Sequence, residues 1–156
     1  MSIKDAMSRF TTGVTVVTTH HDGQDWGMTC NSFNTVSLDP AMVLWSIRKE
    51  ANSHHAFTQS GSYLVNVLQA DQKDTALRFA TGPQSQRFAD QACERTEHNN
   101  VKLMGSVAWF ECRLTQIVSA GDHDILIGEV MHFGSQDGDG LAYGNRHFGV
   151  LNAFEN

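Results

Sequence analysis

The spacing of apolar residues changes from a helical to a strand period within the first twenty positions. Residues 1–10 have the spacing of an amphipathic helix, with apolar side chains at Ile3, Ala6, Met7 and Phe10. Ser2 precedes them as the predicted N-cap. The segment 11–19 is rich in threonine and valine and predicts a strand, and Asp22-Gly23 beyond it is typical of a hairpin turn. The chain is therefore expected to begin with a short helix that leads into a β-hairpin.

Further strands are predicted in the middle of the chain. Residues 28–38 alternate loosely between apolar and polar, which predicts one bent strand or two short ones before a break at Asp39-Pro40. The runs 42–47 and 63–68 are almost continuously apolar. Such runs are typical of strands that are buried on both faces.

Two short helices are predicted to separate these strands. Asn52 and Ser53 are suitable N-caps for a helix that runs through Phe57. Asp71 is expected to cap a second helix, whose apolar face consists of Ala76, Leu77 and Ala80. Residues 81–100 are mostly polar and begin with a Gly-Pro pair, so we expect mainly loop there.

The C-terminal half predicts strands without helices between them. Residues 107–114 alternate cleanly, and the runs 125–130 and 141–143 add two strands separated by a glycine-rich loop. The chain thus has about seven short strands and no regular alternation of strands with helices. This pattern favours a mainly β fold, an antiparallel barrel with a few short peripheral helices, in one domain over residues 1–156.

Composition and charge exclude some partners. Of the 156 residues 40% are hydrophobic and only 18% are charged, against about 25% charged in typical domains. The low charge fraction indicates that a ligand or a second subunit covers part of the surface. Eleven Lys and Arg against 17 Asp and Glu give a net charge of −6, which excludes a broad electrostatic grip on nucleic acid or an anionic membrane.

The cysteines and the N-terminus predict a cytoplasmic protein. Cys30, Cys93 and Cys112 are odd in number and contain no Cys-x-x-Cys pair, which favours reduced thiols. The first residues lack the apolar run of a signal peptide, and no apolar stretch approaches the roughly 18 residues of a membrane span.

Several common chemical motifs are absent from the sequence. It contains no dinucleotide-binding glycine fingerprint, no phosphate-binding P-loop, and neither a His-Glu-x-x-His nor a Gly-x-Ser-x-Gly motif. Eight histidines are present, but His and Cys do not follow zinc-site spacings, so no metal site is expected.

Segment 27–32 is the first candidate for binding chemistry. It combines small residues with hydroxyl and amide side chains, in the order Gly27, Met28, Thr29, Cys30, Asn31 and Ser32. Such a strand lets a planar ligand lie against its backbone and form hydrogen bonds with its polar side chains. A polar edge strand has the same pattern, so both interpretations stay open.

Three other segments carry candidate groups. The strand ending in Ser46, Ile47 and Arg48 is followed by Ser53 at a helix start, which suits a phosphate, although Arg48 is equally explained as a solvated charge. In the turn at 121–123, His123 can present an imidazole that titrates near neutrality, or it is an ordinary surface histidine. The segment 146–148 offers a basic and aromatic contact or a terminal strand.

Taken in order, eight segments of the chain resemble the short-chain flavin reductases, the reductase components of two-component flavin monooxygenases. The matching segments are FTTGVTVVT at 10–18, GMTCNSF at 27–33, VSLDP at 36–40, VNVL at 65–68, RFA at 78–80, WFECR at 109–113, GDH at 121–123 and IGEV at 127–130. They run in the same order over nearly the whole chain.

This resemblance implies an antiparallel split β-barrel of the Greek-key, FMN-binding type. It implies a homodimer that binds FMN or FAD near the subunit interface and takes electrons from NADH or NADPH, with a monooxygenase as partner for the reduced flavin. By analogy, residues 27–32 and Ser37 would line the flavin, Ser46, Ile47, Arg48 and Ser53 would hold its phosphate, and Arg87 with Phe88 would close over it. His123 would be the catalytic-site residue that meets the nicotinamide.

Two other functions stay open at this point. A non-catalytic flavin-binding module, a sensor or store, could use the same barrel, although the Gly-Asp-His turn favours the enzyme because a mere binder needs no nicotinamide site. An oxidase with its own organic substrate, similar to the pyridoxamine phosphate oxidases, would need a second basic phosphate pocket, which the sequence does not indicate.

Overall fold

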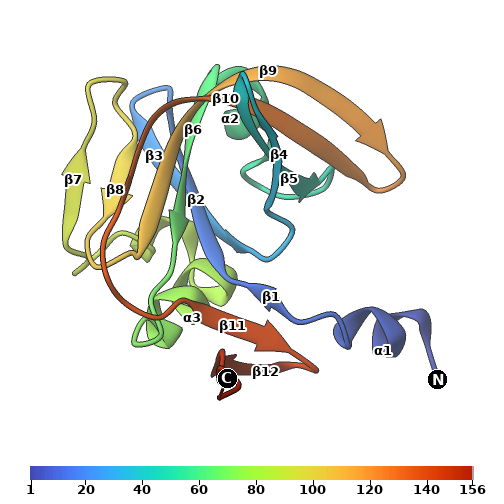
Figure 1. Cartoon of the computed structure of the whole chain (residues 1–156). Coiled ribbons are helices and arrows are strands. Elements are labelled where there is room, and N and C mark those ends of the chain that lie inside the picture. The colour runs from blue at the N-terminus through green and yellow to red at the C-terminus, as the bar shows by residue number, and fades with distance from the viewer. Residues whose placement is uncertain (156) are drawn as a thin grey trace.

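The computed structural model describes residues 1–155 and is built around one antiparallel sheet of seven strands (Figure 1). The strands lie in the order β3-β2-β6-β9-β10-β5-β4. Their bounds are β2 Thr15–His21, β3 Gln24–Cys30, β4 Asn34–Leu38, β5 Ala41–Arg48, β6 Ser62–Val67, β9 Ala108–Ala120 and β10 His123–Ser135. The outermost strands, β3 and β4, come from neighbouring parts of the chain but lie at opposite ends of the sheet order.

Smaller elements surround this sheet. A three-stranded sheet joins β1 Thr12–Gly13, β11 Leu141–Gly144 and β12 His147–Val150, and a hairpin joins β7 Cys93–Arg95 to β8 Val101–Leu103. The helical segments are α1 Ile3–Ser8, α2 His54–Gln59, α3 Lys73–Thr81 and the 3₁₀ turn η1 Gln84–Gln86. Within residues 1–155, no helix has the length and apolar character needed to cross a membrane.

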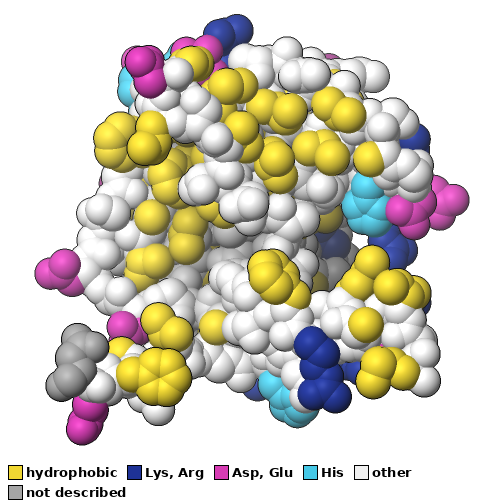
Figure 2. Space-filling view, turned by 45° about the vertical axis from the view of Figure 1, so that its right-hand side comes forward, with side chains coloured by type: hydrophobic (Ala, Val, Ile, Leu, Met, Phe, Trp, Pro, Cys, Tyr) yellow, Lys and Arg dark blue, Asp and Glu magenta, His cyan; other side chains and the backbone are white. Residues whose placement is uncertain are grey.

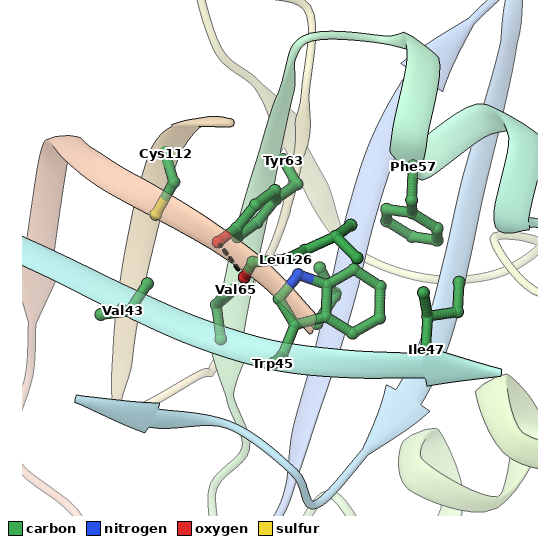
Figure 3. Close-up of a cluster of buried hydrophobic side chains, with 9 residues drawn as sticks. Val43, Trp45, Ile47, Phe57, Tyr63, Val65, Cys112 and Leu126 are labelled. Atoms are coloured by element: carbon green, nitrogen blue, oxygen red, sulfur yellow. Dashed lines mark hydrogen bonds between the residues drawn. The ribbon is translucent and has the colours of Figure 1, made fainter. Parts of the chain in front are cut away.

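A buried cluster holds the large sheet in a curled shape (Figure 3). Val17 of β2, Trp45 of β5 and Leu126 of β10 all belong to it, so strands from both halves of the sheet meet around one core. The Trp45 ring lies edge-on to Phe57 of α2, with 4.8 Å between ring centroids. The Tyr63 hydroxyl donates a hydrogen bond to the Leu126 carbonyl at 3.3 Å, which satisfies the one polar group of that ring inside the core.

A second cluster covers another part of the sheet and fixes α3. Ala76 and Phe79 of α3 are fully buried in it with Val16 of β2 and Leu68. The ring of Phe79 packs so closely on β3 that a Cβ built on Gly27 would lie 2.7 Å from it. Gly27 is therefore required by helix-to-strand packing, and α3 and the segment after it are held beside β3.

Most elements predicted from the sequence are confirmed. The first helix begins after Ser2, whose hydroxyl accepts a hydrogen bond from the Asp5 backbone in a full capping box. Asp22 and Gly23 both have positive φ in the β2–β3 turn, as the hairpin prediction requires. The segment 28–38 contains the end of β3 and all of β4, the terminal segment 146–148 leads into a strand, and the fold is mainly antiparallel β with a few short helices.

Other predictions about local structure are wrong. The run 42–47 alternates between buried and partly exposed positions, so β5 is not buried on both faces. The helix α3 begins at Lys73 with Gln72 as N-cap instead of Asp71. Its buried side chains are Ala76 and Phe79, while Leu77 is 42% exposed. Residues 81–100, in contrast, are mainly loop as predicted, with the short elements η1 and β7 among them.

Candidate active site

A cavity of about 460 Å³ opens between β3, the turn before α2 and the segment that follows α3. Its lining comes from residues 28–29, 51–53, 79–84 and 87, and we call it the Arg87 cavity. Its volume lies in the range of sites for small molecules and cofactors. Of the flavin-binding residues predicted from the sequence, the structure brings Met28, Thr29, Ser53 and Arg87 together here.

Arg87 is a fixed cation in the wall of this cavity. Its Nε donates to the Gly82 carbonyl at 2.9 Å and one terminal nitrogen donates to the Gly27 carbonyl at 2.7 Å. These two bonds tie the segment after α3 to β3 and hold the guanidinium in one orientation. Partial burial lowers the pKa of Arg87, yet an arginine stays charged at neutral pH. The cavity therefore has a permanently positive, pre-oriented group.

Two hydroxyl groups contribute to the lining in different ways. Ser53 is 5% exposed and its hydroxyl donates only to the sulfur of Met28, at 3.7 Å. Sulfur is a weak acceptor, so this buried hydroxyl is available to a better partner. The Thr29 hydroxyl instead donates to the Ala76 carbonyl of α3 at 2.6 Å. Thr29 thus holds the helix against β3, while Ser53 is the freer polar group.

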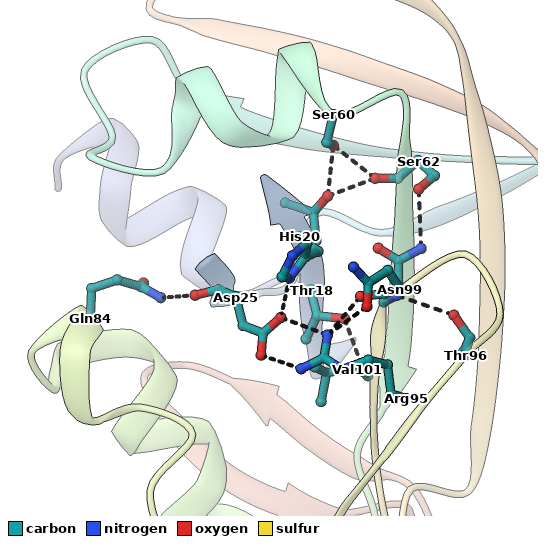
Figure 4. A network of polar contacts seen from close by, with 12 residues as sticks. Thr18, His20, Asp25, Ser60, Ser62, Gln84, Arg95, Thr96, Asn99 and Val101 are labelled. Carbon is teal, nitrogen blue, oxygen red and sulfur yellow. Dashed lines mark hydrogen bonds and ion pairs between the residues drawn. The ribbon is translucent and has the colours of Figure 1, made fainter. Parts of the chain in front are cut away.

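A polar network around Asp25 of β3 positions part of the remaining wall (Figure 4). The carboxylate of Asp25 accepts two hydrogen bonds from Arg95, at 2.7 and 2.9 Å, and contacts the His20 ring at 2.7 Å. The hydrogen bonds from Arg95 are the main cause of the lowered pKa of Asp25. The Asp25 backbone carbonyl accepts from the Gln84 side chain at 3.3 Å, so this network also orients a lining residue of the Arg87 cavity.

A second cavity of about 330 Å³ adjoins the first, and the two share Thr29, Ala80 and Thr81. Cys30 and Asn31 line this second space, together with the tilted ring pair of Tyr143 and Phe148. The Cys30 sulfur lies 3.1 Å from the Thr15 hydroxyl, and burial raises the pKa of this thiol. Cys30 is therefore a neutral thiol at neutral pH, and the shared residues place the two cavities next to each other along α3.

Arg48 and His123 lie together at another end of the sheet. They are cross-strand partners on β5 and β10, and a cavity of about 280 Å³ there is lined by residues 48–50 and Asp122. The His123 ring contacts the Asp122 carboxylate at 2.7 Å and lowers its pKa through that hydrogen bond. The structure thus groups Arg48 with His123 in a cavity whose lining differs from that of the Arg87 cavity, although the Arg48 carbonyl accepts a hydrogen bond from the Ala51 backbone of that lining at 3.1 Å.

Other predicted residues have structural roles in this chain. Ile47 is fully buried in the core beside Trp45, so its side chain is not a phosphate contact. The backbone of Ser46 exchanges two hydrogen bonds with the Ser32 hydroxyl, which attaches the loop after β3 to β5. Ser37 lies beside a bulge on the edge strand β4.

Phe88 and Gly27 do not line the Arg87 cavity themselves but contact its lining residue Phe79. Phe88 packs edge-on against Phe79, with 5.0 Å between ring centroids. The absence of a side chain at Gly27 lets both rings approach β3. The Phe88 ring packs against the second core cluster and is only partly buried, and its closing over a flavin stays a prediction.

Much of the cavity wall was not predicted from the sequence. Asn52 and residues 80–84 line the Arg87 cavity, although the polar segment after α3 predicted mainly loop and no binding role for these residues. The Gly-Pro pair at 82–83 was a signal for a tight turn. Nothing in the spacing showed that this turn folds back against β3, because the contact is made by Arg87 bonding to Gly82 and Gly27.

Comparison with known families gives this fold and site their context. A family model described as "Flavin reductase like domain" matches residues 7–152, which is nearly the whole chain. The chain belongs to the flavin reductase-like family. The resemblance noted in the sequence is thereby confirmed, and with it the expectation of an oxidoreductase family that works with flavin and nicotinamide.

Two curated relatives make this membership more specific. The flavin reductase-like chain is 45% identical over 142 residues to the reductase component of the flavin-dependent trigonelline monooxygenase of Acinetobacter baylyi. That match covers 90% of this chain but only 46% of the relative. This chain is also 40% identical over 148 residues to the FMN reductase (NADH) SmoA of Agrobacterium fabrum. That match covers 95% of this chain and 84% of SmoA.

A solved structure gives the same result for the fold. The NADH:FAD oxidoreductase SgcE6 of Streptomyces globisporus, in complex with NAD and FAD fragments, superposes with a TM-score of 0.91 at 32% identity. The match covers 96% of this chain and 91% of SgcE6. The fold of this flavin reductase-like chain is therefore one on which both cofactor types are bound in a relative.

Proposed function

We propose that this chain is an NADH-dependent flavin reductase that binds its flavin in the Arg87 cavity and supplies reduced flavin to a partner monooxygenase. The observation that carries the proposal is the guanidinium of Arg87, fixed by two backbone carbonyls in the wall of a cavity of small-molecule size. The family and the names of the relatives support it. The chain covers less than half of the trigonelline relative, so the partner stays part of the proposal.

The residues of the cavity fit a flavin phosphate and its ring system. A phosphate is recognised by a cation and hydroxyl or backbone donors, and Arg87 with the buried Ser53 hydroxyl offers this combination. Met28, Phe79 and Ala80 supply apolar surface in the same cavity. FMN is the preferred flavin, because SmoA is named an FMN reductase and a single phosphate suits a single fixed cation.

The protein contributes position and charge to the reaction. Flavin accepts a hydride, two electrons and one proton, from the nicotinamide, and this chemistry belongs to the cofactors. Arg87 binds the phosphate of the ligand and thereby holds the flavin in one orientation. The walls formed by β3 and α3 exclude water from one side of the ligand.

The nicotinamide donor is assigned to the end of the sheet that carries His123. Arg48 and Lys49 in the neighbouring cavity supply positive charge for the donor's phosphates. His123 is a positioning residue in this proposal, oriented by its contact with Asp122. His123→Ala is expected to raise the KM for NADH and leave kcat nearly unchanged, because the substitution removes a contact that binds the donor and takes no direct part in hydride transfer. A collapse of the hydride-transfer rate at unchanged KM would contradict this role.

A homodimer is the proposed working form. Leu38 on the edge strand β4 is 96% exposed and Phe133 on β10 is 73% exposed, with Val36, Ile117 and Val118 also accessible. Figure 2 shows hydrophobic side chains gathered over one face of the molecule. An exposed apolar surface of this kind is typical of an interface.

Two measurements test this function. Purified protein is mixed with FMN, FAD or riboflavin, and NADH oxidation is followed at the nicotinamide absorbance band. Turnover that saturates with FMN supports the proposal, and the absence of NADH oxidation with every flavin refutes it. Light scattering of wild type and Leu38→Glu tests the dimer, and a wild-type chain that is monomeric at assay concentration contradicts the proposed interface.

A further inference from the structure

Three metal-ligating side chains meet on the surface, outside the Arg87 cavity. Glu97 and His98 lie in the loop between β7 and β8, and His132 lies on β10. One Glu97 carboxylate oxygen is 3.2 Å from Nε2 of His132 and 3.7 Å from Nε2 of His98. The two imidazole rings are stacked, with 5.7 Å between centroids. All three ligand atoms lie within 4.8 Å of one another.

Two of the three ligand separations match the first coordination shell of a transition metal. Zinc binds imidazole nitrogen and carboxylate oxygen at about 2.0–2.2 Å, so neighbouring ligands of a tetrahedral ion lie about 3.3 Å apart. The separations from Glu97 to the two histidines, 3.2 and 3.7 Å, fall around that value, and the two histidine nitrogens lie within 4.8 Å of each other. Two imidazoles and one carboxylate with the fourth position open form a recognised zinc-ligand set.

A buried network holds the loop in this position. Glu111 of β9 is 1% exposed, and its carboxylate accepts hydrogen bonds from the Thr96 hydroxyl and from the Asn100 side chain. Thr96 and Asn100 bracket Glu97 and His98, and their backbones are joined by a hydrogen bond of 2.9 Å. Arg95 donates to the Asn99 carbonyl at 2.8 Å, a contact that is part of the network in Figure 4.

The residue that carries this carboxylate is also paired with the third ligand across the sheet. Glu111 is the cross-strand partner of His132, at a register shift between Val130 and His132. The loop is therefore anchored to β9 directly beside the β10 position that carries His132. Two ligands come from a loop fixed in a defined shape and the third comes from a rigid strand, so little rearrangement is needed to bind an ion.

We propose that Glu97, His98 and His132 form a binding site for Zn²⁺ or a neighbouring first-row divalent ion. The ion takes one ligand atom from each side chain and keeps an open position for water. When bound, it joins the β7–β8 loop to β10 and holds this hairpin against the large sheet. None of the three residues lines the Arg87 cavity, so the proposed ion does not occupy the proposed flavin site.

The direct test is calorimetric titration of untagged protein with Zn²⁺ alone. Wild type is expected to bind one ion per chain, and His132→Ala and Glu97→Gln are each expected to weaken binding at least about tenfold, since even indirect ligand partners contribute that much. His147→Ala is the matched control, because His147 is exposed on β12 and outside the cluster. Circular dichroism confirms that each variant is folded.

Two outcomes of the titration would overturn the proposal. The first is the absence of binding by wild type at millimolar Zn²⁺. The second is unchanged affinity in His132→Ala, which would locate the ion elsewhere. A thermal scan gives a second readout, with the Tm of wild type raised by about 5–10 °C at free zinc 100-fold above Kd, and no such rise in His132→Ala.

The pH dependence distinguishes a metal site from simple ion pairs. Metal binding needs neutral imidazoles and releases protons, so Zn²⁺ affinity falls as the pH is lowered. Ion pairs between Glu97 and protonated histidines would instead strengthen as the pH is lowered. Zinc affinity that does not decline as the solution is made more acidic, with the protein still folded, would contradict the proposed ligands.

Discussion

Replacing Arg87 by Gln tests the proposed flavin site most specifically. The substitution removes the charge and both hydrogen bonds by which Arg87 holds the Gly27 and Gly82 carbonyls. It leaves the shape of the cavity wall nearly intact, because glutamine is polar and only somewhat shorter. Two separate quantities should change, the affinity for FMN and the stability of the fold.

The size of each effect follows from the contacts. A hydrogen bond to a charged group contributes about 1.5–3 kcal/mol, which corresponds to an increase of about 10- to 150-fold in the Kd for FMN. Water replaces the lost donor at the two carbonyls, because Arg87 is only partly buried. We therefore expect a stability loss of only about 1–2 kcal/mol, or a Tm lowered by about 2–8 °C.

The assay is fluorescence titration of FMN, with riboflavin in parallel. Arg87→Lys keeps the charge but not the fork geometry, so its Kd should lie between those of wild type and Arg87→Gln. Arg113→Gln is the control, since Arg113 forms a surface ion pair with Glu129 at 2.8 Å, and such pairs contribute little. Equal losses for FMN and riboflavin would refute the assignment of Arg87 to the phosphate.

Three further predictions concern packing, charge and thiols. Gly27→Ala should lower the free energy of unfolding by about 1–3 kcal/mol, because its Cβ would meet the Phe79 ring, whereas Gly149→Ala, with open space around it, should change it little in denaturant titration. Asp25→Asn should be less stable than wild type at neutral pH. Thermal melts at several pH values should show this stability difference shrinking below about pH 4, as the pH falls through the lowered pKa of Asp25. Exposed Cys93 should react with a thiol reagent in native protein, but buried Cys112, with its pKa raised to about 12, should react only after unfolding.

The sequence predicted helix starts and turns well where the deciding interaction joins residues that are close together in the chain. The Ser2 cap and the Asp22-Gly23 turn are confirmed because the deciding interactions lie within a few residues. The start of α3 was missed for the opposite reason. Gln72 bonds to the Gln69 backbone and to the distant Met104 carbonyl, so tertiary contact fixed that boundary and Asp71 did not.

The part of the candidate site that lies on β3 could be predicted from the sequence, but the loop that packs against β3 could not. The segment around Met28 and Thr29 was found because small and polar residues in a strand are conspicuous. The loop that completes the wall depends on Arg87 bonding across to Gly27. The sequence did not predict the cluster of Glu97, His98 and His132. The buried Glu111 holds the loop that carries two of these ligands close to β10, and the spacing of ligands along the sequence cannot indicate such a contact.

The central claim is that a flavin bound beside Arg87 accepts hydride from NADH. Anaerobic stopped-flow mixing of NADH with protein and FMN measures this step directly through loss of the oxidised flavin absorbance. We predict that the flavin is reduced and that the rate saturates with NADH. In Arg87→Gln, a higher FMN concentration should be needed to reach the same rate. Flavin that stays oxidised in the presence of wild-type protein and excess NADH would contradict the account.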